Sequence, residues 1–288
     1  MKISKGLFVA FIAIILGSCF DPPEFPNVPE IAYNDIEFLP GKPGEPDSLV
    51  VRIDFRDGDG DLGLSSENIR HISFPYNSVT YYQAVNEQLV ALNTNAIADT
   101  LHLLEIPNPS LGRLVFPRTR KQAGYEFLPA YPACEAYEFK DLPSLLVAKA
   151  DTAVLDEFVK IVKKLSINTN EYYLIQDTLY YTVNPNHYNI EVDFLLRDAS
   201  STEPDHPGYR EFDWRKEYCT TFDGRFPMLA DDGVNSSLDG TLRYSMESRG
   251  FIINFGINTP MKLRIQIKDR ALNLSNVIFT PEFTLDQI

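Results

Sequence analysis

The sequence is poor in cysteine, histidine, tryptophan and basic residues. The shortage of basic residues limits the partners that the protein can bind. Of its 288 residues, three are cysteine, four are histidine and one is tryptophan. Lysine and arginine number 26 against 40 aspartates and glutamates, which gives a net charge of −14. Nucleic acids and anionic membrane surfaces attract clustered positive charge. This balance therefore argues against both as partners.

Motifs of the common enzyme classes are also missing. The four histidines, at positions 71, 102, 187 and 206, form no H-E-x-x-H pattern, and there is no G-x-S-x-G and no phosphate-binding G-x-x-x-x-G-K-[S/T]. His187 and Glu191 fall on one face of a strand, which a polar sheet surface explains without catalysis. A fold can still bring two carboxylates together for glycoside hydrolysis. We expect a non-enzymatic protein, with an envelope hydrolase as an alternative.

The N-terminus reads as an export signal. Lys2 and Lys5 precede an apolar run from Leu7 to Leu16, which is shorter than the roughly 20 residues of a membrane-spanning helix. The following Leu-Gly-Ser-Cys, ending at Cys19, resembles the lipobox of bacterial lipoproteins. This resemblance implies that residues 1–18 are a cleaved signal peptide and that Cys19 carries the lipid.

Residues 19–30 contain four prolines and are expected to form a short, semi-rigid lipidated tether. Phe20 stands where the retention signals of inner-membrane lipoproteins have aspartate. The resemblance therefore implies the outer membrane, with either the periplasmic or the surface-facing leaflet left open.

Period-two alternation of apolar and polar residues dominates the rest of the chain. It is clearest over 49–55, 188–194 and 263–267, and it predicts half-buried strands. Further strands are expected at 31–39, 68–74, 81–85, 101–106, 113–116, 178–183, 241–246, 251–257 and 277–285. Many short strands separated by Pro, Gly, Asn and Asp favour β-sandwiches over a parallel α/β sheet.

One segment breaks this alternation. Apolar residues recur at helical spacing behind Asp151, a typical N-cap residue, and predict a helix over 152–165. The positions that carry this spacing are Val154, Leu155, Phe158, Ile161, Val162 and Leu165. We expect the helix to pack this stripe against a neighbouring sheet, as part of an insertion over 141–170.

Several strings resemble a group of uncharacterised outer-membrane lipoproteins from the Bacteroidota. They include Asp57 to Gly63, Asn184 to Tyr188, Asp223 to Pro227 and Lys268 to Asn273. The last of these also resembles a hairpin of bacterial immunoglobulin-like domains, with Leu272 where glycine is common. The resemblance implies location and architecture, and it brings no activity.

The predicted fold is mainly β, with tandem immunoglobulin-like β-sandwiches and one helical insertion. An N-terminal β-domain is expected over 31–140, the helical insertion over 141–170 and a C-terminal immunoglobulin-like β-domain over 171–288. Trp214 is expected to anchor a sheet core; stacking on a sugar is the alternative.

Two cysteines remain after lipidation of Cys19. In an oxidising envelope, Cys134 and Cys219 have one intramolecular pairing, and we predict a disulfide between them.

Asp57, Asp59 and Asp61 place carboxylates at alternate positions of a turn, as hard-cation sites do. The turn has Leu62 and Asn68 where an EF-hand loop has glycine and glutamate. A Ca²⁺ site, completed by Asp35 or Glu67, and a solvated Asp-Gly turn both remain open. Ca²⁺ is the one cofactor that the sequence suggests.

The pattern D-[S/T]-[A/I/L/V/M/T] resembles the periplasmic O-glycosylation motif of Bacteroidota. It predicts modification at Ser48, Thr100, Thr152 and Thr178, although helix caps and strand starts have the same composition.

Together these features predict a lipid-anchored envelope protein with a binding or assembly role at the outer membrane. Its expected partners are the membrane, reached through covalent lipid, and an envelope protein or glycan. The alternative is a surface module that binds glycan or peptide and has a Ca²⁺-stabilised turn.

Overall fold

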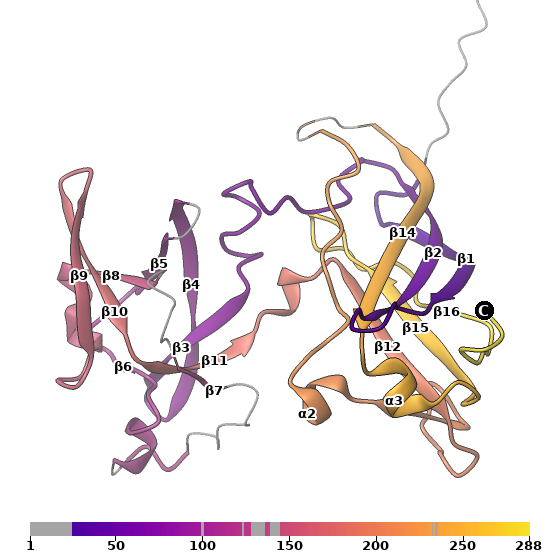
Figure 1. Ribbon diagram of the computed structural model, residues 1–288. Helices are drawn as coiled ribbons and strands as arrows, with labels where there is room; N and C mark the ends of the chain where they lie inside the picture. The colour runs from indigo at the N-terminus through magenta and orange to yellow at the C-terminus, as the bar shows by residue number, and fades with distance from the viewer. Residues whose placement is uncertain are drawn as a thin grey trace, which may run out of the picture.

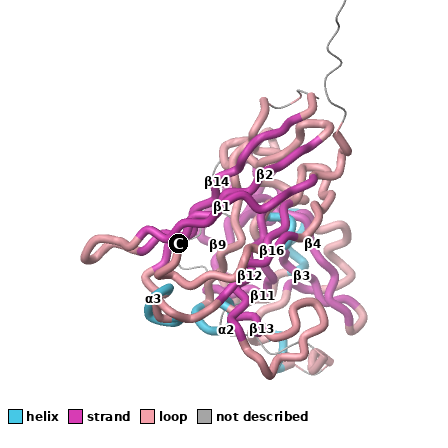
Figure 2. The backbone as a smooth tube through the Cα atoms, turned by 90° about the vertical axis from the view of Figure 1, so that its right-hand side faces the viewer, coloured by secondary structure: helices cyan, strands magenta, loops and turns pink. Residues whose placement is uncertain are grey.

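The computed structural model describes residues 25–98, 101–122, 124–127, 136–138, 145–231, 233 and 236–288. Strands and loops make up nearly all of this part, and its helices are short (Figure 2). The prediction of a mainly β fold is confirmed. Within the described part, no helix has the length and apolar character needed to cross a membrane.

The first body is a sandwich of two antiparallel sheets (Figure 1). One sheet has the order β1 (Glu30–Leu39), β2 (Asp47–Asp57) and β14 (Leu238–Ser248). The other has the order β13 (Tyr209–Phe212), β12 (Ile190–Arg197), β15 (Met261–Ile267) and β16 (Ile278–Phe279). Two short helices, α2 (Trp214–Tyr218) and α3 (Phe251–Phe255), and the 3₁₀ turn η3 (Pro185–His187) complete this body.

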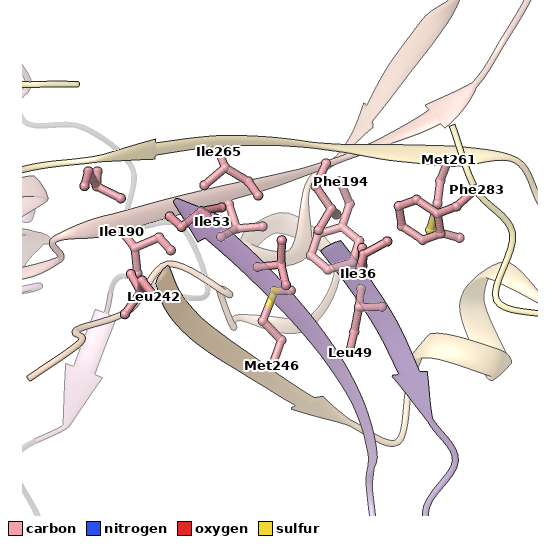
Figure 3. Packing of buried hydrophobic residues seen from close by; sticks show 14 of the residues in the cluster. Ile36, Leu49, Ile53, Ile190, Phe194, Leu242, Met246, Met261, Ile265 and Phe283 are labelled. Carbon is pink, nitrogen blue, oxygen red and sulfur yellow. The ribbon is translucent and has the colours of Figure 1, made fainter. Parts of the chain in front are cut away.

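The core of the sandwich forms between the facing sheets. Ile53 and Leu242 from one sheet point toward Ile190 and Ile265 from the other (Figure 3). Trp214 is only 7% exposed, and its ring meets that of Phe194 edge-on with centroids 5.6 Å apart. Trp214 is therefore a core residue, as expected from the sequence.

The second body is a nine-stranded sheet inserted in the chain between β2 and β12, with an apolar core of its own (Figure 1). Its pairs are antiparallel except for β5 with β8. The order is β7 (Ala136–Glu138), β11 (Thr178–Val183), β3 (Val79–Val85), β4 (Gln88–Ala98), β5 (Leu101–Glu105), β8 (Leu145–Ala148), β10 (Asn170–Gln176) and β9 (Lys160–Ile167), with β6 (Arg113–Leu114) beside β3. The 3₁₀ turns η1 (Thr119–Lys121) and η2 (Lys149–Val154) lie in its loops.

This arrangement corrects the predicted division into domains at 31–140 and 171–288. β2 pairs with β14 along its whole length, from Asp57 opposite Leu238 to Asp47 opposite Ser248. The first strands of the chain thus complete a sandwich with the last ones, and the inserted domain occupies the middle. Alternation predicts where a strand runs and which face it buries, but it does not choose a partner strand.

The predicted helix over 152–165, and with it the helical insertion over 141–170, is wrong. The 3₁₀ turn η2 ends at Val154, and β9 forms a hairpin with β10. Asn168 and Thr169, with φ of 50° and 71°, make the two-residue turn between these strands. The β-branched residues over 159–167 favour a strand, and the helical spacing of the apolar positions is coincidental.

Two of the predicted strands are also wrong. Residues 68–74 form turns, and residues 251–255 form helix α3. Over 277–285, only Ile278–Phe279 form a strand. The remaining predicted strands are present, within a few residues at each end.

Candidate metal site at the end of strand β2

The three predicted carboxylates lie together where the chain leaves β2. Asp57, Asp59 and Asp61 each offer one ligand oxygen, and these oxygens lie within 4.8 Å of one another. Gly60 has a φ of 73°, a conformation that glycine adopts without strain. At Gly58, a Cβ atom would come within 2.3 Å of the carbonyl oxygen of Phe25. The two glycines thus let the backbone fold tightly enough to gather the carboxylates.

Three buried oxygen atoms in this turn lack a hydrogen-bond donor within the described part of the chain. They are the Oδ1 atoms of Asp57, Asp59 and Asp61. The other oxygen of Asp57 accepts from the Asp61 backbone N–H at 3.0 Å, and that of Asp61 accepts from the Ala271 N–H at 2.9 Å. Asp57 is fully buried. Buried anionic oxygens are costly unless they are paired or bind a cation.

A fourth carboxylate, from Asp269, faces the same turn. Asp269 is 3% exposed and begins the tight hairpin that follows β15. Asn273 holds its carboxylate, with the backbone N–H at 2.7 Å and the side-chain amide at 2.8 Å. Leu272, at a φ of 68°, takes the left-handed conformation of the turn despite not being glycine. The hairpin thus forms, and it positions Asp269 opposite the Asp57–Asp61 turn.

Burial and mutual repulsion raise the pKa values of these carboxylates. Burial, and then the negative charge of Asp59, raise the pKa of Asp57 to about 6. Burial, followed by the charge of Asp269, raises the pKa of Asp61 to about 6, with Arg270 acting in the opposite direction. The pKa of Asp269 is also raised, first by burial. A bound cation would relieve this repulsion.

Neither Asp35 nor Glu67, suggested from the sequence to complete the site, belongs to the group of carboxylates gathered at this turn. Asp35 pairs with Arg52 at 2.7 Å on the exposed face of β1, and Glu67 lies exposed in the loop that follows the turn. Sequence reasoning did not connect Asp269 with this turn, because Asp269 stands in another part of the chain. The hairpin pattern around Asp269 was the only signal available.

The donor set suits a hard cation. Three carboxylates gather within 4.8 Å, the nearby charge of Asp269 adds to theirs, and Ca²⁺ binds six to eight oxygen atoms, many of them from carboxylates. The glycine missing from the EF-hand pattern is replaced by Leu62, which is fully buried in the sandwich core. The turn therefore supplies Leu62 to the core and three carboxylates to the candidate site.

The other candidate residues lie apart from this site. His71 and His206 are buried, and burial lowers the pKa of both His102 and His187. Asp57, Asp59 and Asp61 form the single group of three or more metal-ligating side chains found within the described residues.

Several predicted modifications stay predictions. Cys19, Thr100 and Cys134 lie outside the described residues, and Cys219 ends helix α2. Ser48 lies half-buried in β2, Thr178 half-buried in β11 and Thr152 half-buried in η2.

Comparison with protein families, curated proteins and solved structures finds no match to this chain.

Proposed function

We propose that this chain is a non-enzymatic, lipid-anchored protein of the outer membrane with a binding or assembly role. We further propose that its sandwich binds Ca²⁺ through Asp57, Asp59, Asp61 and Asp269. The observation that carries the cation site is the set of three buried carboxylate oxygens that have no hydrogen-bond donor in the described part of the chain.

The arrangement of charge supports a divalent cation. Asp57 is fully buried and Asp269 nearly so, and the neighbouring cation is Arg270. Its guanidinium donates to the carbonyl oxygens of Leu62 and Gly63, at 3.4 and 3.3 Å. One arginine leaves most of the negative charge of four carboxylates uncompensated. Ca²⁺ would supply the missing charge and accept the unpaired oxygens as ligands.

The N-terminal sequence supports the anchor. The Leu-Gly-Ser-Cys sequence resembles a lipobox, which supports lipid on Cys19, and the four prolines of residues 19–30 suit a short tether. The tether reaches the sandwich beside the cation site, because the Gly58 N–H donates to the Pro26 carbonyl at 2.8 Å. The guanidinium of Arg56 also lies over the ring of Phe25 at 5.7 Å. The site would therefore stiffen the end of the sandwich at which the membrane tether arrives.

An immunoglobulin-like sandwich is the finer fold that we propose for the first body. Its antiparallel sheets of three and four strands pack over one apolar core. The number and arrangement of these strands support this assignment.

Thermal unfolding of the purified full chain tests the cation site. Ca²⁺ at about 100 times its Kd is expected to add about 2.7 kcal/mol to the free energy of unfolding and to raise Tm. EDTA should reverse the shift. Asp59→Asn should abolish it, whereas Asp239→Asn, at an exposed position on β14, should leave it unchanged. The same Tm in EDTA and in millimolar Ca²⁺ would contradict the site.

Metabolic labelling with a fatty acid tests the anchor. The native chain should incorporate the label and fractionate with outer membranes, and Cys19→Ala should do neither. Release of the unmodified wild-type chain as a soluble protein would contradict the anchor.

A further inference from the structure

The candidate cation site adjoins the two connections between the sandwich and the inserted domain. The outgoing segment, residues 65–78, runs from the Asp57–Asp61 turn to β3. The return segment, residues 184–189, runs from β11 to β12. Both connections are visible between the two bodies in Figure 1.

These two segments are bonded to each other. The side-chain amide of Asn184 donates to the carbonyl oxygens of Pro75 and Asn77, at 2.7 and 2.8 Å. Asn184 and Asn77 are both buried. The backbone N–H of Asn184 also donates to the Ser78 carbonyl at 3.1 Å. The connections therefore form one unit at the base of the inserted domain.

The hairpin that carries Asp269 holds this unit through the residues on either side of Asp269. Lys268 donates to the Pro185 carbonyl of the return segment at 3.0 Å. On the other side, the carbonyl of Arg270 accepts the hydroxyl of Tyr76 from the outgoing segment. The backbone N–H of Arg270 also donates to the Asp61 carbonyl at 3.2 Å. Lys268 thus contacts the return segment, and Arg270 contacts both the outgoing segment and the Asp57–Asp61 turn.

The charge of the cluster acts directly on this hairpin. Without a cation, the charge of Asp269 and those of the Asp57–Asp61 turn repel one another, which opposes the backbone bonds from Arg270 and Ala271 that hold the hairpin to Asp61. A divalent cation between them replaces that repulsion by attraction from both sides. The hydrogen bonds of Lys268 and Arg270 join the hairpin to both connecting segments, so a shift of the hairpin would move them as well.

We propose that Ca²⁺ at this site locks the junction between the sandwich and the inserted domain, so that the cation controls how freely the inserted domain moves. This proposal rests on the proposed cation site. It assigns that site a regulatory role: a Ca²⁺-loaded protein holds its two domains as one body, and a Ca²⁺-free protein lets them move.

Hydrogen exchange of the full chain, measured by mass spectrometry in Ca²⁺ and in EDTA, tests the junction. The amides of the outgoing and return segments should exchange about tenfold more slowly in Ca²⁺. The β9–β10 hairpin, at the far edge of the inserted sheet, should exchange equally in both. Calorimetric titration of Ca²⁺ into the same sample separates the two proposals. Binding without slower exchange at the junction overturns the locking, whereas absence of binding overturns the site itself.

Tyr76→Phe tests whether the contact with Arg270 couples the cation site to the outgoing segment. This change removes the hydroxyl that bonds to Arg270 and leaves the four carboxylates in place. Ca²⁺ should still bind, but its protection of the outgoing segment should be lost, while protection of the Asp57–Asp61 turn remains. Tyr82→Phe is the matched control, because it removes a tyrosine hydroxyl bonded to Thr182 within the inserted domain. Equal protection in both variants would contradict the route through Arg270.

Discussion

After burial, the largest contribution to the raised pKa of Asp61 is the negative charge of Asp269, on a hairpin from the other sheet of the sandwich. The inserted domain separates the two residues in the chain, and the fold returns them to one place. Asp61 lies in the turn that leads to the buried Leu62, and Asp269 begins the hairpin that follows β15. Their encounter creates a concentration of negative charge that neither turn has by itself.

The stabilisation by Ca²⁺ should depend on pH. In the metal-free fold, Asp57 and Asp61 have pKa values of about 6, against an ordinary value of 3.8. The fold binds their protons more tightly than the unfolded chain, so their contribution to stability is full below pH 3.8 and is lost as pH rises through 6. Ca²⁺ needs the deprotonated forms, so it should stabilise most where the protons have left.

We therefore expect the Ca²⁺-induced rise in Tm to be large at about pH 7.5 and nearly absent at about pH 5. The charged and titratable groups around the two carboxylates are Asp59, Asp269, Arg270 and Tyr76. A thermal shift of equal size at both pH values would contradict the assignment of these carboxylates as ligands.

In the inserted domain, Arg118 should contribute strongly to stability. It bonds to Asp156 at 2.5 Å and to Asp177 at 2.6 Å, and the side chains of both aspartates are largely buried. Its guanidinium also lies 4.2 Å from the centre of the Phe116 ring. Arg118→Met leaves two buried carboxylates without their cation and should cost about 3–5 kcal/mol. Urea unfolding provides the measurement.

Lys149→Met is the control for Arg118. Lys149 pairs with Glu171 where both side chains are more than half exposed, so its loss should cost less than about 1 kcal/mol. Equal losses in the two variants would contradict the role of burial.

The core around Trp214 offers a test of packing. Phe194 is fully buried, and the ring of Trp214 packs against its edge. Phe194→Ala should cost about 3–5 kcal/mol and should expose the tryptophan to acrylamide quenching. Phe158→Ala, at a residue that is 68% exposed, should change stability little and leave the quenching as it is. Strong quenching in the wild-type chain would contradict the buried position of Trp214.

The turn of the β9–β10 hairpin supports a stabilising substitution. Thr169 is β-branched and has a φ of 71°, which is unfavourable for its side chain. Thr169→Gly should raise the free energy of unfolding by about 0.5–1 kcal/mol. A decrease in the free energy of unfolding would contradict the left-handed conformation at Thr169.

The sequence predicts a strand and its inner face where one face of that strand is buried in the core. Val51, Ile53 and Phe55 alternate with Arg52 and Asp54, and in the structure all three apolar side chains are buried. The alternation follows from the geometry of a strand, so it predicts the strand and its inner face. It says nothing about β14, which supplies the partner of β2 from the opposite end of the chain.

The helix prediction failed for a related reason. Strand β9 is an edge of its sheet, with Ile161 and Val162 exposed, so burial imposes no period-two pattern on it. The residual pattern matched a helix by chance. Asn168, a residue that favours left-handed turns, was the available signal for a hairpin.

Three of the four carboxylates at the candidate site were predictable. Asp57, Asp59 and Asp61 follow one another in the sequence, so their closeness was foreseeable. Asp269 was recognised as part of a hairpin, but its approach to the turn depends on how the two sheets pack. No local pattern encodes that packing.

Calorimetric titration of Ca²⁺ into the full chain and its Asp269→Asn variant tests the central claim most directly. We expect one Ca²⁺ per chain in the wild type and a Kd at least tenfold weaker in Asp269→Asn, a loss of about 1.4 kcal/mol or more. Asp239→Asn should match the wild type. Absence of binding, or equal affinity in Asp269→Asn and the wild type, would contradict a site that joins the Asp57–Asp61 turn to the Asp269 hairpin.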